Sequence, residues 1–164
     1  MQDLRSASYV LHPPLLDEAG LEPALCSFVE HFARRTNTSI DLDIPSGLGR
    51  LPSEIEISLF RFVQDALTDF SRHSKGIPLQ IGIDLCGPDV VVTISKEREV
   101  RTSAFLSSLR RATFVVPPGR QSVGVAAMQE RLHRIGGRLE VDPIGDKAVL
   151  KAIIRAGRSQ APVP

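Results

Sequence analysis

The sequence predicts an α+β fold, a two-layer α/β sandwich in which three main helices cover one face of a mixed sheet. Segments with helical and strand periodicity follow one another as helix, strand, helix, hairpin, long loop, helix and hairpin. A chain of 164 residues with 42% hydrophobic residues has an ordinary size for one domain and can bury a real core. We therefore expect one domain, with flanking segments at either end.

The first third of the chain contains two helical segments and a strand. A helix over residues 4–11 is expected to stop at Pro13, because proline and the residue before it disfavour helix. Apolar residues at helical spacing predict a helix over residues 21–35, and Asn37 helps to end it. Alternation of apolar and polar residues then predicts a strand with one wet face at residues 40–44.

The central helix has a clear start signal. Ser53 is a good N-cap, and Glu56, three residues later, completes a capping box. The helix has an apolar face that is expected to be core: Ile55, Leu59, Phe62, Val63, Ala66, Leu67 and Phe70. The opposite face is charged and carries Arg61, Asp65, Asp69 and Arg72.

The second half of the chain is predicted to contain two hairpins separated by a helix. Gly87 and Pro88 are a turn signal between the first pair of strands. Gly136 is the expected left-handed end of the helix. The elements are strands at 79–85 and 90–95, an irregular stretch at 96–121 with a short helix near 102–111, a helix at 122–135, and strands at 138–142 and 148–155.

Composition excludes several classes of partner. A net charge of +1 gives no strong attraction to nucleic acid or to a membrane surface. Cys26 and Cys86 are far apart and have no metal-type spacing, so we expect buried free thiols in a reducing cytosol. No apolar run could span a bilayer and no signal peptide is visible, which predicts a cytoplasmic domain whose parent protein could still be membrane-anchored.

Four segments, in order and with the expected spacing, carry a resemblance to a known family. The chain resembles the catalytic, ATP-binding domain of sensor histidine kinases of the nitrate-sensor class, whose superfamily includes gyrase, chaperone and mismatch-repair ATPases. The segments are LHPPLLD with Gly20 and Leu21, residues 62–73, Gly124 to Arg131, and residues 136–140. The resemblance implies the end of a dimerisation helix and a linker at 1–20, an ATPase-like domain at 21–157 and a flexible tail at 158–164.

On the central helix the resemblance assigns three site residues. Asp65 stands where the family has a glutamate, and Asp69 stands where an asparagine binds the magnesium of the nucleotide. A carboxylate is a competent magnesium ligand, so Asp69 is the candidate metal residue and Asp65 a weak candidate for catalysis. His73 matches the family's Arg-His pair. Without the resemblance, the two aspartates are a solvated face, and His73 compensates the helix dipole.

The first nucleotide-binding motif departs most from the family pattern. The family has Asp-x-Gly-x-Gly, whose aspartate accepts a hydrogen bond from the adenine amino group. Here the aspartate position holds Lys96, which has only donors. Arg98 and Val100 replace glycines that let the backbone approach the ligand. Glu97 is the neighbouring acceptor and could serve if the register slipped by one residue.

The second motif, Gly-x-Gly-Leu-x-Gly-Met in the family, keeps only its middle glycine. Ser122 and Ala127 replace the outer glycines, while Gly124 and Val125 keep free amides at a helix start that could still meet an anion. The losses at both motifs sum to about 3–5 kcal/mol, which corresponds to an affinity weakened roughly 100- to 5000-fold.

These departures lead to three hypotheses. The first is a degenerate ATPase-like signalling module with weak or no ATP binding, no expected cofactor, and a regulatory or interaction role. Its partners would be a dimerisation and phosphotransfer domain or a response regulator. The alternative is a divergent, active kinase domain that uses Mg-ATP and phosphorylates a histidine on a separate dimerisation helix. The third is an anti-sigma-type protein kinase, which the linker motif at residues 11–16 disfavours. Whether the chain is an enzyme stays open.

Two further expectations concern the whole chain. The family's phosphoacceptor histidine lies upstream of the linker, and His12 belongs to the linker motif itself, so His12 is a poor acceptor candidate. Lacking a complete dimerisation helix, the chain is expected to be a monomer.

Overall fold

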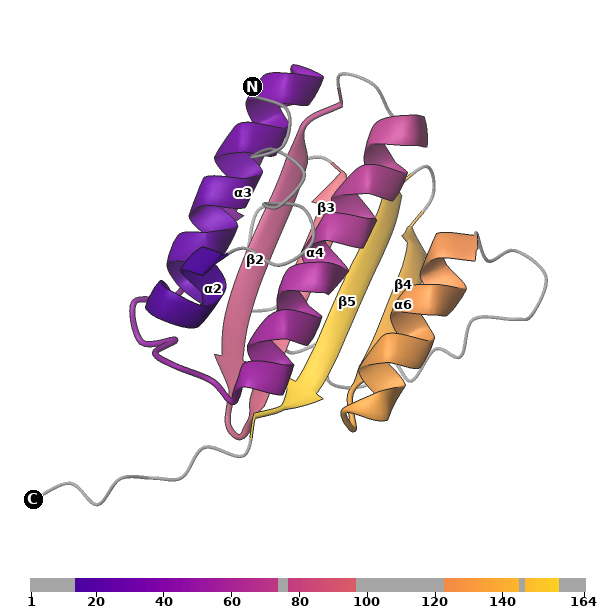
Figure 1. Ribbon diagram of the computed structural model, residues 1–164. Coiled ribbons are helices and arrows are strands. Elements are labelled where there is room, and N and C mark those ends of the chain that lie inside the picture. The colour runs from indigo at the N-terminus through magenta and orange to yellow at the C-terminus, as the bar shows by residue number, and fades with distance from the viewer. Residues whose placement is uncertain (1–13, 74–76, 97–122, 145–146, 157–164) are drawn as a thin grey trace, which may run out of the picture.

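The computed structural model describes residues 14–73, 77–96, 123–144 and 147–156 (Figure 1). Its helices are α2 (Pro14–Ala19), α3 (Leu21–Thr36), α4 (Ser53–His73) and α6 (Val123–Arg134). Its strands are β1 (Ile40–Asp43), β2 (Leu79–Cys86), β3 (Asp89–Lys96), β4 (Arg138–Ile144) and β5 (Lys147–Arg155). The predicted helix at 4–11, most of the irregular stretch at 96–121 and the tail lie outside the described residues.

The strands form one five-stranded mixed sheet in the order β1-β2-β3-β5-β4. β1 and β2 are parallel, with Ile40 opposite Leu79, so the chain must cross over between them and does so through α4. All other neighbouring pairs are antiparallel. α4 therefore lies within a β-α-β unit, which fixes it against the sheet.

The three long helices α3, α4 and α6 lie on one face of the sheet, as Figure 1 shows. The predicted two-layer sandwich is confirmed. The core forms between them, because alternate strand residues point at the helices and the apolar face of α4 meets them. Every predicted core position of α4 is buried, and the strands contribute Ile81, Ile83, Val90, Val92, Ile94, Leu150, Ala152 and Ile154.

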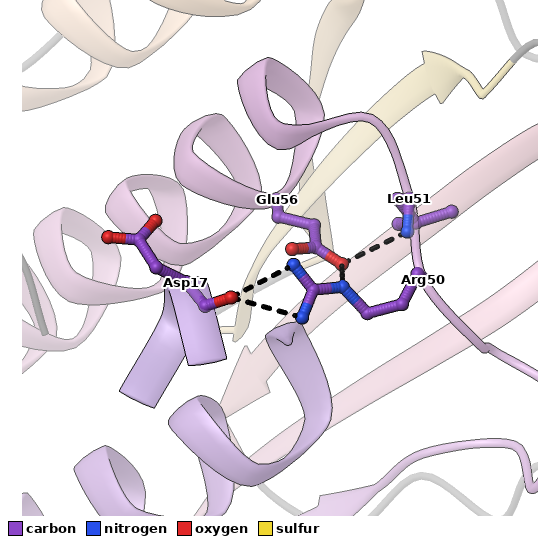
Figure 2. A network of polar contacts seen from close by, with 4 residues as sticks. All are labelled: Asp17, Arg50, Leu51 and Glu56. Atoms are coloured by element: carbon purple, nitrogen blue, oxygen red, sulfur yellow. Dashed lines mark hydrogen bonds and ion pairs between the residues drawn. The ribbon is translucent and has the colours of Figure 1, made fainter. Parts of the chain in front are cut away.

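The residue that caps the start of α4 is Pro52, one position before the predicted cap, Ser53. The carbonyl of Pro52 accepts from the amides of Ile55 and Glu56, at 2.9 and 3.1 Å. The Glu56 carboxylate accepts from the amide of Leu51 at 3.0 Å (Figure 2). Because Pro52 has no N–H, the back-reaching carboxylate bonds the residue before it. Ser53 is thus the first helical residue rather than the cap.

Both predicted helix ends are confirmed, and both are left-handed, as was predicted for Gly136. Asn37 ends α3 with φ 51°, and its amide bonds the carbonyl of Ala33. Gly136 follows α6 with φ 71°. The amides of Gly136 and Gly137 bond the carbonyls of His133 and Leu132 at 3.1 and 2.9 Å, the paired bonds of a Schellman motif.

Two predictions about particular residues need correction. Cys26 is exposed and Cys86 is half-buried, and both are free, so the expected burial is wrong. Cys26 falls outside the stripe of α3 that faces the core, which contains Ala24, Leu25 and Val29. The last hairpin is also longer than expected, because β4 continues through Pro143, a residue that an edge strand tolerates.

Among the helices within the described residues, none has the length and apolar character that crossing a bilayer requires.

Candidate functional site

The candidate site is built on the outward side of α4. Asp65 and Asp69 lie one helical turn apart and both are half-buried. The opposite side of the same turn is held in the core by Phe62, Ala66 and Leu67, each at most 1% exposed. The two carboxylates therefore have a rigid support on the predicted charged face of the helix.

Asp65 is engaged by a residue from the neighbouring helix. Nη1 of Arg131, on α6, donates to Oδ2 of Asp65, and the two groups form an ion pair. Their side chains are 40% and 39% exposed, so water screens the pair substantially. The contact joins α4 to α6 and uses an acceptor atom of the weak catalytic candidate.

Lys96, the last residue of β3, lies at the other end of this region. It continues the alternation of Val92 and Ile94, whose side chains face the helices. Its Nζ lies 5.4 Å from the centroid of the Phe70 ring, within the range of a cation–π interaction. Phe70 is 6% exposed and follows Asp69 directly on α4. The ammonium group therefore packs against the helix that carries both aspartates.

Some of the remaining predicted site residues lie within the described part of the chain, and others lie outside it. Gly124 and Val125 are the second and third residues of α6, both half-buried, and Val125 packs against the core. His73 is the last residue of α4. Glu97, Arg98 and Ser122 lie outside the described residues, so their part in a site stays a prediction.

The described residues contain no group of three or more His, Cys, Asp or Glu side chains placed to hold a metal ion. Magnesium in nucleotide sites is usually held by one or two carboxylates together with phosphate oxygens, so a site with the single carboxylate Asp69 would not need such a group. The proposed role of Asp69 as a magnesium ligand therefore stays a prediction. A shallow hollow of about 310 Å³ between α6 and β4 involves none of the predicted site residues.

Two residues at this site were not predicted to be part of it. The sequence indicates Arg131 only as part of a segment that resembles the family, and it indicates Phe70 only as a core residue. Arg131 lies 66 residues from Asp65, and no local pattern joins them. The available signal was its place on α6, next to the buried Leu132, combined with a charge opposite to that of Asp65.

Comparison with known proteins places these observations in context. No family model matches the chain. The chain is 25% identical over 141 residues to the signal transduction histidine-protein kinase/phosphatase DegS of Brevibacillus brevis, covering 86% of this chain and 33% of DegS. It is 26% identical over 142 residues to the sensor histidine kinase MctS of Rhizobium johnstonii, covering 87% of this chain and 29% of MctS. The chain thus spans about a third of the length of these relatives.

Solved structures agree on the fold. The histidine kinase domain of the blue-light activated histidine kinase EL346 of Erythrobacter litoralis superposes with a TM-score of 0.64 at 14% identity. The match covers 93% of this chain and 72% of that domain. These matches show that the chain is related to sensor histidine kinases, and its sheet order and helix layer agree with the fold of a histidine kinase domain.

Proposed function

We propose that this chain is a signalling module of a two-component system that has lost most of its ability to bind ATP and acts by regulation or protein interaction. The observation that carries the proposal is Lys96. The resemblance places an acceptor carboxylate for adenine at this position, whereas the ammonium group here lies over the Phe70 ring. A lysine can only donate, so the adenine amino group would find no acceptor at this residue.

The ion pair between Asp65 and Arg131 bears on the same proposal, because it occupies one of the two acceptor oxygens of the weak catalytic candidate. An acid that must orient or activate a group on a substrate needs an accessible acceptor atom. Here Oδ2 of Asp65 already accepts from a guanidinium group. The two contacts, at Asp65 and at Lys96, link the candidate site on α4 to α6 and to β3.

The expected partners are a dimerisation and phosphotransfer domain or a response regulator. The proposal for these partners rests on the relatives, which are described as histidine kinases.

Calorimetric titration of the chain with ATP or ADP in the presence of magnesium is the direct test. We expect no saturable binding below the millimolar range, in line with a loss of roughly 100- to 5000-fold from a micromolar site. A dissociation constant in the micromolar range would refute the proposal. Arg34→Met, a substitution in an exposed ion pair on α3, is a suitable control for non-specific heats.

The second candidate is a divergent but active kinase domain, and Asp69 favours it. This half-buried carboxylate remains on the same face of α4 as Asp65 and is a competent magnesium ligand. An active domain should transfer phosphate from Mg-ATP to the histidine of a supplied dimerisation helix, and Asp69→Ala should abolish the transfer. If transfer is absent from the native chain, or survives Asp69→Ala, this candidate fails.

A further inference from the structure

The first turn of α4 carries a buried carboxylate that the candidate site does not use. Glu56 is 1% exposed, although it lies in the first turn of a helix. Its Oε1 accepts from the amide of Leu51 at 3.0 Å and lies 3.3 Å from Nε of Arg50. A buried carboxylate is stable only when it is paired and hydrogen-bonded, so Arg50 is its charge partner.

Arg50 also reaches a different element. Its Nη1 and Nη2 both lie 3.3 Å from the main-chain carbonyl oxygen of Asp17, in α2, as Figure 2 shows. The last four carbonyls of a helix have no partner within the helix, and a cation near them is favourable. One planar guanidinium group therefore joins the last turn of α2 to the first turn of α4, across 33 residues of sequence.

The backbone around α2 is shaped to admit this side chain. Gly20 has φ 92°, and a Cβ added there would lie 2.9 Å from Cδ of Arg50. Leu16 and Leu21, on either side, are 2% and 1% exposed and hold the turn against the core. Burial of Leu16 and Leu21 thus holds α2 against the core, while the Arg50 fork links its carbonyl end to Glu56.

We propose that Arg50 is a latch that couples the docking of α2 to the amino-terminal turn of α4. α2 lies in the segment that resembles the family's linker, and α4 is the helix that carries Asp65 and Asp69. A displacement of α2 removes the Asp17 carbonyl acceptor from Arg50 and loosens the pairing of the buried Glu56. The latch is a conformational device that operates whether or not the chain binds nucleotide.

Hydrogen–deuterium exchange of the whole chain, followed by mass spectrometry, tests the latch. Arg50→Lys keeps the charge beside Glu56 but lacks the planar fork that reaches Asp17 at the same time. We expect exchange of the α2 amides and of Gly20 to rise about tenfold or more, while the sheet amides keep their protection. Arg34→Lys, on an exposed arginine paired with Glu30, is the matched control and should leave α2 unchanged.

Glu56→Gln separates coupling from direct contact, because the Glu56 carboxylate accepts from Leu51 and pairs with Arg50, both of which lie in the loop between β1 and α4. We expect this variant to raise α2 exchange as well, whereas Glu54→Gln, an exposed acid of the same turn, should not. The latch is refuted if neither Arg50→Lys nor Glu56→Gln changes α2. It is equally refuted if both variants raise exchange uniformly in α2, α4 and the sheet, since Arg50 would then be a general stabiliser.

Discussion

Asp84 lies on β2, on the face of the strand opposite the one that carries the core residues Ile81 and Ile83. Burial raises the pKa of this carboxyl above its ordinary value of 3.8, and the charge of Lys151 lowers it by less. A raised pKa means that the folded chain binds this proton more tightly than the unfolded chain does. The stability contributed by this group is therefore present below its ordinary pKa and lost as the pH rises through the raised value.

Asp84→Asn should therefore raise the midpoint temperature of unfolding near pH 7, because the amide carries no charge to desolvate. The difference from the native chain should vanish at about pH 3, where the native carboxyl is also neutral. Lys151 keeps Glu140 as a partner at 3.5 Å, so its nearly buried ammonium group stays compensated. Thermal melts at both pH values provide the measurement, with Asp41→Asn, an exposed aspartate on the neighbouring strand, as control. A variant that is less stable at pH 7 would contradict the expectation.

Single residues also mark where sequence reasoning succeeded and where it failed. Helical periodicity places Asp65 and Asp69 on one face of α4, because the opposite face is apolar, whereas their candidacy as site residues comes from the resemblance. The partner of Asp65 did not follow, since Arg131 reaches it only after α6 packs beside α4. Arg50 could not be predicted at all, because its acceptor on α2 is a main-chain carbonyl, which every residue has.

Among the secondary-structure elements, the turn between α6 and β4 makes the strictest demand on residue type. Gly136 has φ 71°, a conformation that costs other residues about 1 kcal/mol. Gly137 is close-packed, because an added Cβ would lie 2.8 Å from Cγ1 of Ile154 and 3.0 Å from the carbonyl oxygen of Ile153. The first glycine is required by backbone conformation and the second by space.

Gly136→Ala should lower the free energy of unfolding by about 1 kcal/mol, and Gly137→Ala by about 1–3 kcal/mol, since the backbone carbonyl cannot yield as a side chain would. Gly47→Ala is the matched control, because nothing lies within 4 Å of its added Cβ. Urea unfolding of the three variants measures these differences. Equal stability of Gly137→Ala and Gly47→Ala would show that the sheet accommodates the methyl group.

The ion pair between α4 and α6 should contribute little to stability despite its place at the candidate site. Both side chains are about 40% exposed, which limits such pairs to roughly 1 kcal/mol or less. A double-mutant cycle with Asp65→Asn and Arg131→Gln should give a coupling energy in that range, and it should shrink at high salt. A coupling above about 2 kcal/mol would mean that the pair is a main structural link between the two helices.

The molecule as a whole was predictable to the level of layers but not of strand order. Local patterns were enough for the β2–β3 hairpin, because Gly87 with φ 62° and Pro88 form its two-residue turn. The placement of β5 between β3 and β4 depends on pairing between segments far apart in the chain. Such pairing is decided by burial of whole faces, which residue-level signals do not encode.

The extent of the folding unit is a property of the whole molecule too. The resemblance places the ATPase-like domain at 21–157, yet Leu16 of α2 is 2% exposed and belongs to the same core cluster as Leu48 and Leu59. Removing residues 1–20 would uncover these side chains and deprive Arg50 of its acceptor on Asp17. The folding unit is therefore expected to include α2.

The free energy of unfolding in urea of a chain that begins at residue 14 provides the reference. A chain that begins at residue 21 should lose at least about 2 kcal/mol, the lower end of the cost of removing a buried leucine. Leu16→Ala in the whole chain isolates the part of that loss due to burial, while Leu15→Ala, at a half-buried position of the same helix, should cost less. If the chain from residue 21 is as stable as the whole chain, α2 does not stabilise the domain, and Leu16 contributes nothing to its core.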